Sequence, residues 1–147
     1  MTIAFSHLGI CVDDAEASMR FYCDALGFEP AEAFTVGAEF GQLMEIDDVG
    51  LRSQFLTRDG VRIELLYFDS PGHEGGPARR PINKLGLTHL SFRVDDVDAV
   101  AAKIEELGGT VVAETRTTFD NPAGSPLDFL YCTDPNGVRI ELMRPPG

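Results

Sequence analysis

Hydrophobic and polar positions follow the same order twice along this chain. A strand pattern comes first at residues 3–12, where apolar and polar residues alternate with a period of two. The same alternation returns around His89, with Ser91 and Arg93 on its face. Paired aspartates that can cap a helix follow each strand, at residues 13–14 and 95–96. We therefore predict a helix ending near Leu26 and a second helix with an apolar stripe formed by Val97, Val100, Ile104 and Leu107.

Strand patterns also follow each predicted helix. The turn signals at residues 58–60 and 134–137 predict hairpins between the last two strands of each half. The order in each half is therefore strand, helix and about three strands. The expected strands after the helices are residues 29–35, 40–46, 54–57 and 61–68 in the first half and residues 111–116, 129–133 and 138–143 in the second.

An exact repeat shows that the two halves are related. The letters GVRIEL occur at residues 60–65 and again at residues 137–142. His7 and His89 are separated by 82 positions, and Glu64 and Glu141 by 77. The second copy is thus five residues shorter between its histidine and its glutamate, as a trimmed loop would make it.

This repeat predicts an α+β fold of two tandem βαβββ modules that share one core. The first module is expected at residues 1–70 and the second at residues 84–147. A linker rich in glycine and proline occupies residues 71–83. Residues 117–128 are expected to form a second long loop, either covering a site or simply exposed.

Composition narrows the classes of function. A chain of 147 residues with 44% hydrophobic residues suits one folded protein with a sizeable core. The net charge of −12 argues against binding to nucleic acid or to an anionic membrane surface, and the scattered carboxylates favour solubility. The sequence has no apolar run of about 20 residues and no signal-peptide pattern. Three cysteines without CxxC spacing suit reduced thiols in the cytoplasm.

Four repeated side chains are candidates for a metal site. Within each GVRIEL strand the Val and Ile residues should face the helix, which places Glu64 and Glu141 on the opposite face, lining a cupped sheet. His7 and His89 fall on that same face. A carboxylate on a partly dry surface is costly unless it is paired or binds a metal. Two imidazoles and two carboxylates suit one divalent ion, Zn, Ni, Fe, Mn or Co, with positions left for water or substrate. Duplication alone could also preserve these residues as a structural relic.

The repeated motifs resemble the vicinal oxygen chelate superfamily, which includes glyoxalase I, methylmalonyl-CoA epimerase, extradiol dioxygenases and bleomycin-resistance proteins. The resemblance covers nearly the whole chain and is strongest in HLGICVDDAEASMRFYCDALGFE, LTHLSFRVDDVDAVAAKIEELGG and FLYCTDPNGVRIEL. It implies a mixed sheet cupped around a metal held by His7, Glu64, His89 and Glu141, and a homodimer. The ligand pattern is closest to glyoxalase I-like lyases and isomerases. By resemblance, Glu141 or Glu64 moves a proton on a carbon next to a carbonyl, through an enediolate or enolate.

Two departures from that family bear on the small-molecule substrate. Cys11 stands where bacterial glyoxalase I usually has an arginine that contacts glutathione, and Phe68 stands where an asparagine is often found. Glu64 also replaces a glutamine that is usual in the epimerase. The changes at Cys11 and Phe68 argue against glutathione as a cosubstrate, and Glu64 is a departure from the epimerase pattern. The expected substrate-binding residues are Cys11, Phe68, Ser91 and Arg93.

Two other functions remain open at this point. An extradiol-type dioxygenase needs two histidines and one carboxylate, so Glu64 would be an extra ligand. Such enzymes commonly use a further pocket histidine, and only His73, in the linker, is left for that role. A metal-free protein that binds a drug in the cleft would not need the four ligand types.

Overall fold

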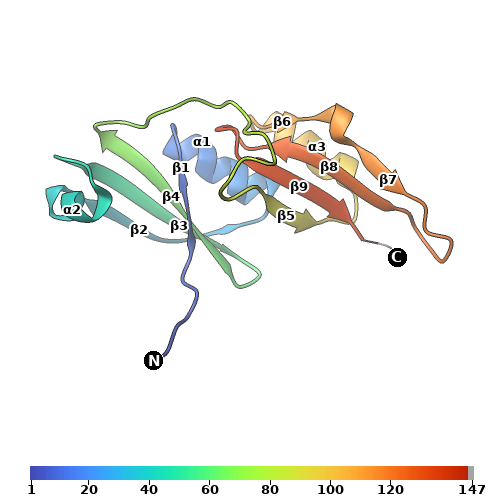
Figure 1. Ribbon diagram of the computed structural model, residues 1–147, viewed down its shortest axis with the longest axis horizontal. Helices are drawn as coiled ribbons and strands as arrows, with labels where there is room; N and C mark the ends of the chain where they lie inside the picture. Colours follow the sequence, from blue (N-terminus) through green and yellow to red (C-terminus); the bar gives the residue numbers. More distant parts are fainter. Residues whose placement is uncertain (146–147) are drawn as a thin grey trace. The chain divides into compact units, whose positions relative to one another are not determined.

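Each half of the chain builds a mixed β-sheet with a helix on one face (Figure 1). The computed structural model describes residues 1–145. The chain divides into two units, the first spanning Met1–Gly75 and the second beginning at Gly76. This boundary lies inside the segment at residues 71–83 that the sequence assigns to the linker. The α+β class expected from the sequence is confirmed, with one sheet of four strands and one of five.

The first unit places its first and last strands side by side. Strand β1 pairs with β4 in parallel, and β3 joins β4 and β2 in antiparallel pairs, so the order is β1-β4-β3-β2. The elements are β1 (Leu8–Cys11), α1 (Ala15–Arg20), a π-helical turn (Phe21–Ala25), β2 (Glu29–Val36), a 3₁₀ turn (Ala38–Phe40), α2 (Gly41–Met44), β3 (Gly50–Arg58) and β4 (Val61–Ser70).

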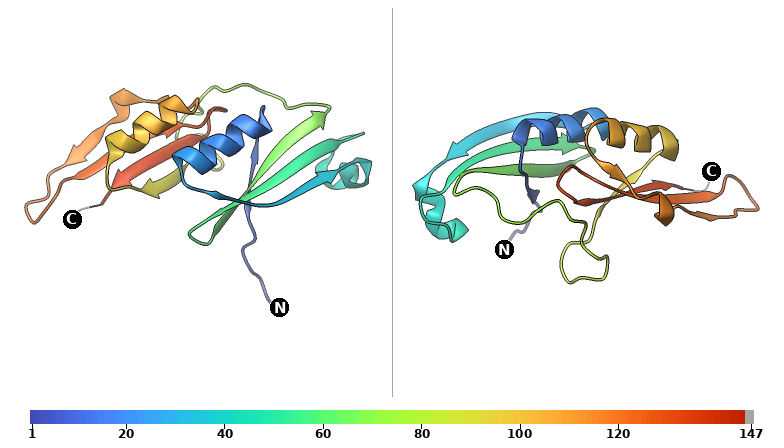
Figure 2. Two further views of the ribbon diagram at one scale, coloured as in Figure 1. Left: turned by 180° about the vertical axis from the view of Figure 1, so that it is seen from behind. Right: turned by 90° about the horizontal axis from the view of Figure 1, so that it is seen from above.

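The second unit repeats this plan with one additional short strand. Its order is β5-β9-β8-β6, with β5 parallel to β9, and β7 pairs with the free end of β8. The elements are β5 (Leu90–Arg93), α3 (Val97–Glu106), β6 (Thr110–Val111), a 3₁₀ turn (Ala113–Thr115), β7 (Thr117–Phe119), β8 (Leu127–Thr133) and β9 (Arg139–Arg144). In both views of Figure 2, α1 and α3 each lie on one face of their own sheet.

The apolar face of each GVRIEL strand packs on its helix, as the alternation predicts. Ile63, Leu65, Ile140 and Leu142 are almost completely buried. Burial of side chains of this size contributes about 1.5–3 kcal/mol each to folding. Val61 is an exception, because it follows the hairpin turn directly and remains exposed. Val97, Ala101 and Ile104 of α3 are buried, and the other two residues of the predicted stripe, Val100 and Leu107, are half-buried.

Three predicted strands are shorter than expected or absent. The strand at residues 3–12 contains only Leu8–Cys11. Because Leu8 pairs with Ile63, the residues before position 6 would pass beyond the start of β4, where the turn offers no backbone partner. Residues 41–44 form α2 instead, in agreement with the high helix propensity of Gln, Leu and Met, and Phe40 ends the 3₁₀ turn before it.

The second half shows a related correction at residues 111–116. The strand stops at Val111, and a 3₁₀ turn follows. The Tyr131 N–H of β8 donates to the Thr115 hydroxyl at 2.9 Å, so a side chain takes the place of a backbone partner there. Residues 117–119 then rejoin the sheet as β7 and residues 127–128 begin β8, which leaves residues 120–126 of the predicted long loop outside helices and strands.

Two aspartates cap the main helices as expected. Asp14 Oδ1 accepts a hydrogen bond from Ala17 N at 2.9 Å, and Asp96 Oδ1 accepts one from Ala99 N at 3.0 Å. Each cap satisfies a backbone donor that the first helical turn leaves unpaired. Among residues 1–145, no helix is long and apolar enough to cross a membrane.

The cap of α3 gives a direct test of this fold. Replacing Asp96 with Ala should lower the free energy of unfolding by about 0.5–2 kcal/mol, because Ala99 N loses its acceptor. Asp95→Ala removes the same charge one residue earlier and serves as the matched control. Urea denaturation followed by circular dichroism measures both. Equal losses in the two variants would mean that charge, rather than the cap, stabilises the helix.

Candidate functional site

The parallel strand pairs bring a histidine and a glutamate together in each unit. Gly9 lies opposite Glu64 in the β1–β4 pair, and Ser91 lies opposite Glu141 in the β5–β9 pair. The two histidines come directly before β1 and β5. Each unit therefore places one imidazole beside one carboxylate, on the sheet face away from its helix.

In the first unit the pair is closely held. His7 Nε2 lies 3.1 Å from Glu64 Oε2. The Ser53 hydroxyl donates to Glu64 Oε1 at 2.5 Å, and the Ser6 hydroxyl lies 2.8 Å from His7 Nδ1. Glu64 is only 16% exposed. Both carboxylate oxygens thus have a partner, and one edge of the imidazole is fixed.

The second unit repeats the pair with looser spacing. His89 Nε2 lies 3.8 Å from Glu141 Oε2, and the Thr88 hydroxyl lies 2.9 Å from His89 Nδ1. The Ser91 hydroxyl donates to Glu141 Oε1 at 2.7 Å. Glu141 is 20% exposed. The hydroxyl that donates to Glu141 comes from β5, the strand that follows His89. The hydroxyl that donates to Glu64 comes from β3, the neighbour of β4 on the side away from β1.

These donor sets fit a divalent metal ion chemically. A proton on Nδ1 that is donated to the Ser6 or Thr88 hydroxyl leaves the Nε2 lone pair facing the carboxylate. With the proton on Nε2 instead, the imidazole donates to the carboxylate at 3.1 Å in the first unit, and a bound cation would take the place of that proton. Each unit supplies one such pair. Within either unit, the described residues 1–145 contain no group of three or more His, Cys, Asp or Glu side chains that could hold a metal ion.

An arginine and an aromatic ring support each histidine. The Arg62 guanidinium lies 4.1 Å above the Phe55 ring, whose edge contact with the His7 ring has a centroid distance of 5.0 Å. Arg139 lies 4.7 Å above Tyr131, whose ring is 5.8 Å from that of His89. Cation–π and edge-to-face contacts each favour one ring orientation. The arginines of both GVRIEL repeats thus restrict the imidazoles through an intervening ring.

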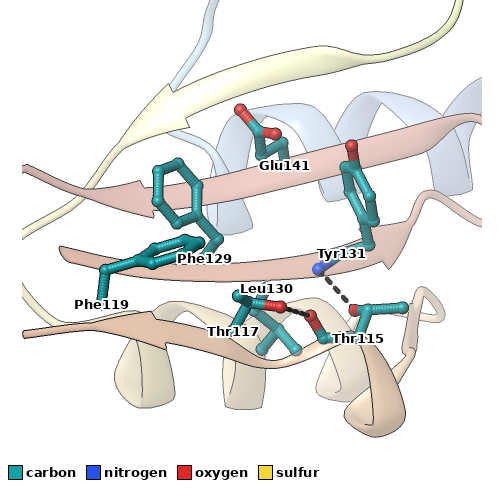
Figure 3. Close-up of a pocket in the computed structure, with 7 residues that line it drawn as sticks. All are labelled: Thr115, Thr117, Phe119, Phe129, Leu130, Tyr131 and Glu141. Carbon is teal, nitrogen blue, oxygen red and sulfur yellow. Dashed lines mark hydrogen bonds between the residues drawn. The ribbon is translucent and has the colours of Figure 1, made fainter.

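A cavity of about 280 Å³ opens beside Glu141 in the second unit (Figure 3). Figure 3 shows the Phe119 and Phe129 rings on one side, the Tyr131 ring on the other, and the Glu141 carboxylate between Phe129 and Tyr131. The lining residues are Thr115, Thr117, Phe119, Phe129, Leu130, Tyr131 and Glu141.

One of the four predicted substrate-binding residues contacts a candidate site glutamate. Ser91 contacts Glu141 directly. Cys11 is exposed at the end of β1, opposite Leu66, and Phe68 is half-buried opposite Leu51. Arg93 is exposed at the end of β5.

The sequence analysis did not identify several residues that touch the two pairs. These are Ser6, Thr88, Ser53, Phe55 and Tyr131. The repeat contained a signal for two of them, because Ser6 and Thr88 have the same 82-residue offset as the histidines. Ser53 had no such signal, since the residue at the equivalent place in β8 is Phe129.

Known proteins resemble this chain over almost its whole length. The family described as Glyoxalase/Bleomycin resistance protein/Dioxygenase superfamily matches residues 4–142. An ethylmalonyl-CoA/methylmalonyl-CoA epimerase of Cereibacter sphaeroides is 30% identical over 140 residues, covering 93% of this chain and 94% of the relative. A probable lactoylglutathione lyase of Synechocystis is 26% identical and covers 94% of this chain and 92% of the relative.

Solved structures show the same fold. A glyoxalase family protein from Bacillus cereus matches with a TM-score of 0.81 and 21% identity, covering 100% of this chain and 97% of that one. The fosfomycin resistance protein FosX of Listeria monocytogenes, solved with Mn(II) and sulfate, matches with a TM-score of 0.58 and 18% identity, covering 99% of this chain and 94% of that one.

The thiol of Cys11 is expected to be unreactive. Partial burial raises its pKa above the ordinary value, and the Asp13 carboxylate raises it further. A higher pKa leaves less thiolate at neutral pH, and the thiolate is the nucleophile. Alkylation of Cys11 by iodoacetamide should therefore be slower than that of free cysteine, and its rate should keep increasing at pH values where the rate for free cysteine has levelled off. Mass spectrometry of the labelled peptide measures the rate, and fast labelling at neutral pH would contradict the prediction.

Proposed function

Because the chain belongs to the Glyoxalase/Bleomycin resistance protein/Dioxygenase superfamily, we propose that it is a metal-dependent lyase or isomerase that moves a proton on a carbon next to a carbonyl. The substrate is a small molecule with adjacent oxygens. The enzymes among its relatives, an epimerase and a probable lactoylglutathione lyase, support this class of reaction. The observation that carries the proposal is the pairing of one histidine with one glutamate, repeated in both units.

The proposed metal ligands are His7, Glu64, His89 and Glu141, which together hold one divalent ion. The Mn(II) of FosX is consistent with an ion of this kind in the same fold. When bound, the ion would supply a Lewis acid for the negative charge that proton removal places on the substrate. The four ligands come from one chain or from two, and a homodimer stays a prediction.

The two glutamates are suited to different roles. Glu64 is held at both oxygens by contacts of 3.1 and 2.5 Å, which suits a fixed ligand. Glu141 is 3.8 Å from its histidine and lines a cavity that can admit a substrate. A general base must reach the substrate proton directly. We therefore assign the proton transfer to Glu141, and the Ser91 hydroxyl keeps its other oxygen oriented.

The number of bound ions tests the shared site. Mass spectrometry of metals in protein loaded with Zn²⁺, Mn²⁺ or Co²⁺ and then desalted should find one ion per chain. His7→Ala and His89→Ala should each abolish most of this binding, because each removes a ligand from the same ion. Replacing His73, which lies in the linker, with Ala is the control and should change nothing. Half the metal remaining in each variant would indicate two separate sites, and no uptake at all would favour the metal-free binding protein.

Replacing Glu141 with Gln tests the base. The substitution keeps the shape of the side chain but removes its basicity, so proton exchange should fall by a factor of about 10²–10⁴ and metal binding should weaken. The assay follows deuterium incorporation from D₂O into methylmalonyl-CoA and into 2-hydroxyacetophenone by NMR, with EDTA-treated protein as the blank. Glu106→Gln, on the exposed side of α3, is the matched control. Full exchange in Glu141→Gln would contradict the assignment, and oxygen uptake with catechols would favour the dioxygenase.

A further inference from the structure

The cavity beside Glu141 has walls that offer few polar groups to a ligand. The Thr115 hydroxyl donates to the Val112 carbonyl at 2.7 Å and accepts from Tyr131 N at 2.9 Å. The Thr117 hydroxyl donates to the Thr115 carbonyl at 3.0 Å. Both hydroxyl protons are therefore already used inside the protein. In the described part of the chain, the cavity lining includes no arginine or lysine, and Glu141 is its charged residue.

Two phenylalanine rings line one side of the cavity. Phe119 and Phe129 are arranged edge to face with ring centroids 6.2 Å apart. Phe119 is 56% exposed, which leaves apolar ring surface in contact with water. A third ring placed against such a pair removes more of that surface from water and gains a further aromatic contact.

The first unit lacks the aromatic residue at the equivalent place. Phe55 and Tyr131 correspond, because each lies opposite the glutamate of its unit. Two residues earlier, the first unit has Ser53, which is buried and bonded to Glu64, whereas the second unit has Phe129. Since duplication produced both units, a polar residue at one place and an aromatic residue at the other mark a specialised surface in the second unit.

The size of the cavity limits what it can hold. An apolar cavity of about 150 Å³ is enough to bind benzene. The cavity here, at about 280 Å³, has room for one ring of that size and a few more atoms. A large cosubstrate would have to remain mostly outside it.

We propose that this cavity binds an uncharged apolar group of the substrate, one aromatic ring or a branched alkyl chain of similar size, with the reacting carbon at the Glu141 end. This inference rests on the proposed function and names the class of substrate for it. The aromatic end removes the ring from water, and the polar end receives the adjacent oxygens. Apart from an ion held by Glu141, the cavity offers a phosphate or carboxylate no positively charged side chain among its described lining residues.

Binding of a matched pair of uncharged compounds tests the inference. The probes are 2-hydroxyacetophenone and hydroxyacetone, which share adjacent oxygens and differ by a phenyl or a methyl group. In metal-free protein, NMR titration should show the phenyl compound binding at least about 10-fold more tightly, since a buried ring gains more than a methyl group. The shifted amides should include Thr117, Phe119 and Phe129. Equal affinity for both compounds, or shifts elsewhere, would overturn the proposal.

Two variants separate the aromatic contact from general effects. Phe119→Ala should weaken binding of 2-hydroxyacetophenone by about 2- to 10-fold and leave hydroxyacetone unchanged. Phe34→Ala removes an equally exposed aromatic ring from the first unit, at 53% exposure, and should leave both compounds unchanged. Equal losses in the two variants would contradict the assignment.

The outcome remains distinguishable from a failure of the proposed function. Binding is measured without metal and without turnover, whereas proton exchange is measured with metal. Ring binding at Phe119 without any exchange would refute the proposed reaction and leave the cavity assignment standing. Exchange that is equally efficient for both compounds, with no ring binding at Phe119, would refute the cavity assignment alone.

Discussion

The parallel pairing of the first and last strands in each unit is the constraint on which the rest of the structure depends. It places Gly9 opposite Glu64 and Ser91 opposite Glu141, so the histidine before each strand meets a glutamate. Parallel neighbours require a crossover connection, and the helix and the strands that follow it in each unit provide it. A slip of one residue in either pairing would turn the glutamate toward the helix and Ile63 or Ile140 toward water. The energy of the apolar core therefore also fixes the position of the polar pair.

The two units keep the same pair but surround it differently. Ser53 closes the space beside Glu64 with a hydrogen bond, whereas Phe129 leaves an apolar cavity beside Glu141. The supporting arginines also differ, because Arg62 pairs with Glu32 at 3.0 Å while Arg139 donates to the Arg80 carbonyl. Under the proposed function, these differences suit the two repeated units to different roles. The first unit would hold the ion firmly, and the second would hold the substrate.

Local patterns predicted the elements whose partners come from their own hairpin or helix. The caps at Asp14 and Asp96, the two long hairpins and the apolar faces of the GVRIEL strands were all predicted correctly. Errors arose where a distant partner decided the result. Residues 3–5 alternate like a strand but lie beyond the start of β4, and residues 117–119 look like a loop but pair with the end of β8. Alternation reports which face a residue prefers, and it does not report whether a neighbouring strand is present.

By itself the sequence determined the α+β fold and the internal repeat, because an exact repeat and a period of two can be recognised without knowledge of contacts. It also identified the four repeated side chains that are the proposed metal ligands. Only the tertiary structure decided what touches those side chains. Ser53 is 11 residues from Glu64 and Ser91 is 50 residues from Glu141, so sequence distance gave no hint that both donate to a glutamate. The aromatic cavity likewise requires Phe119 and Phe129 to meet across β7 and β8. Hydrogen bonds and ring contacts of this kind depend on strand register, which is set by the packing of the whole sheet.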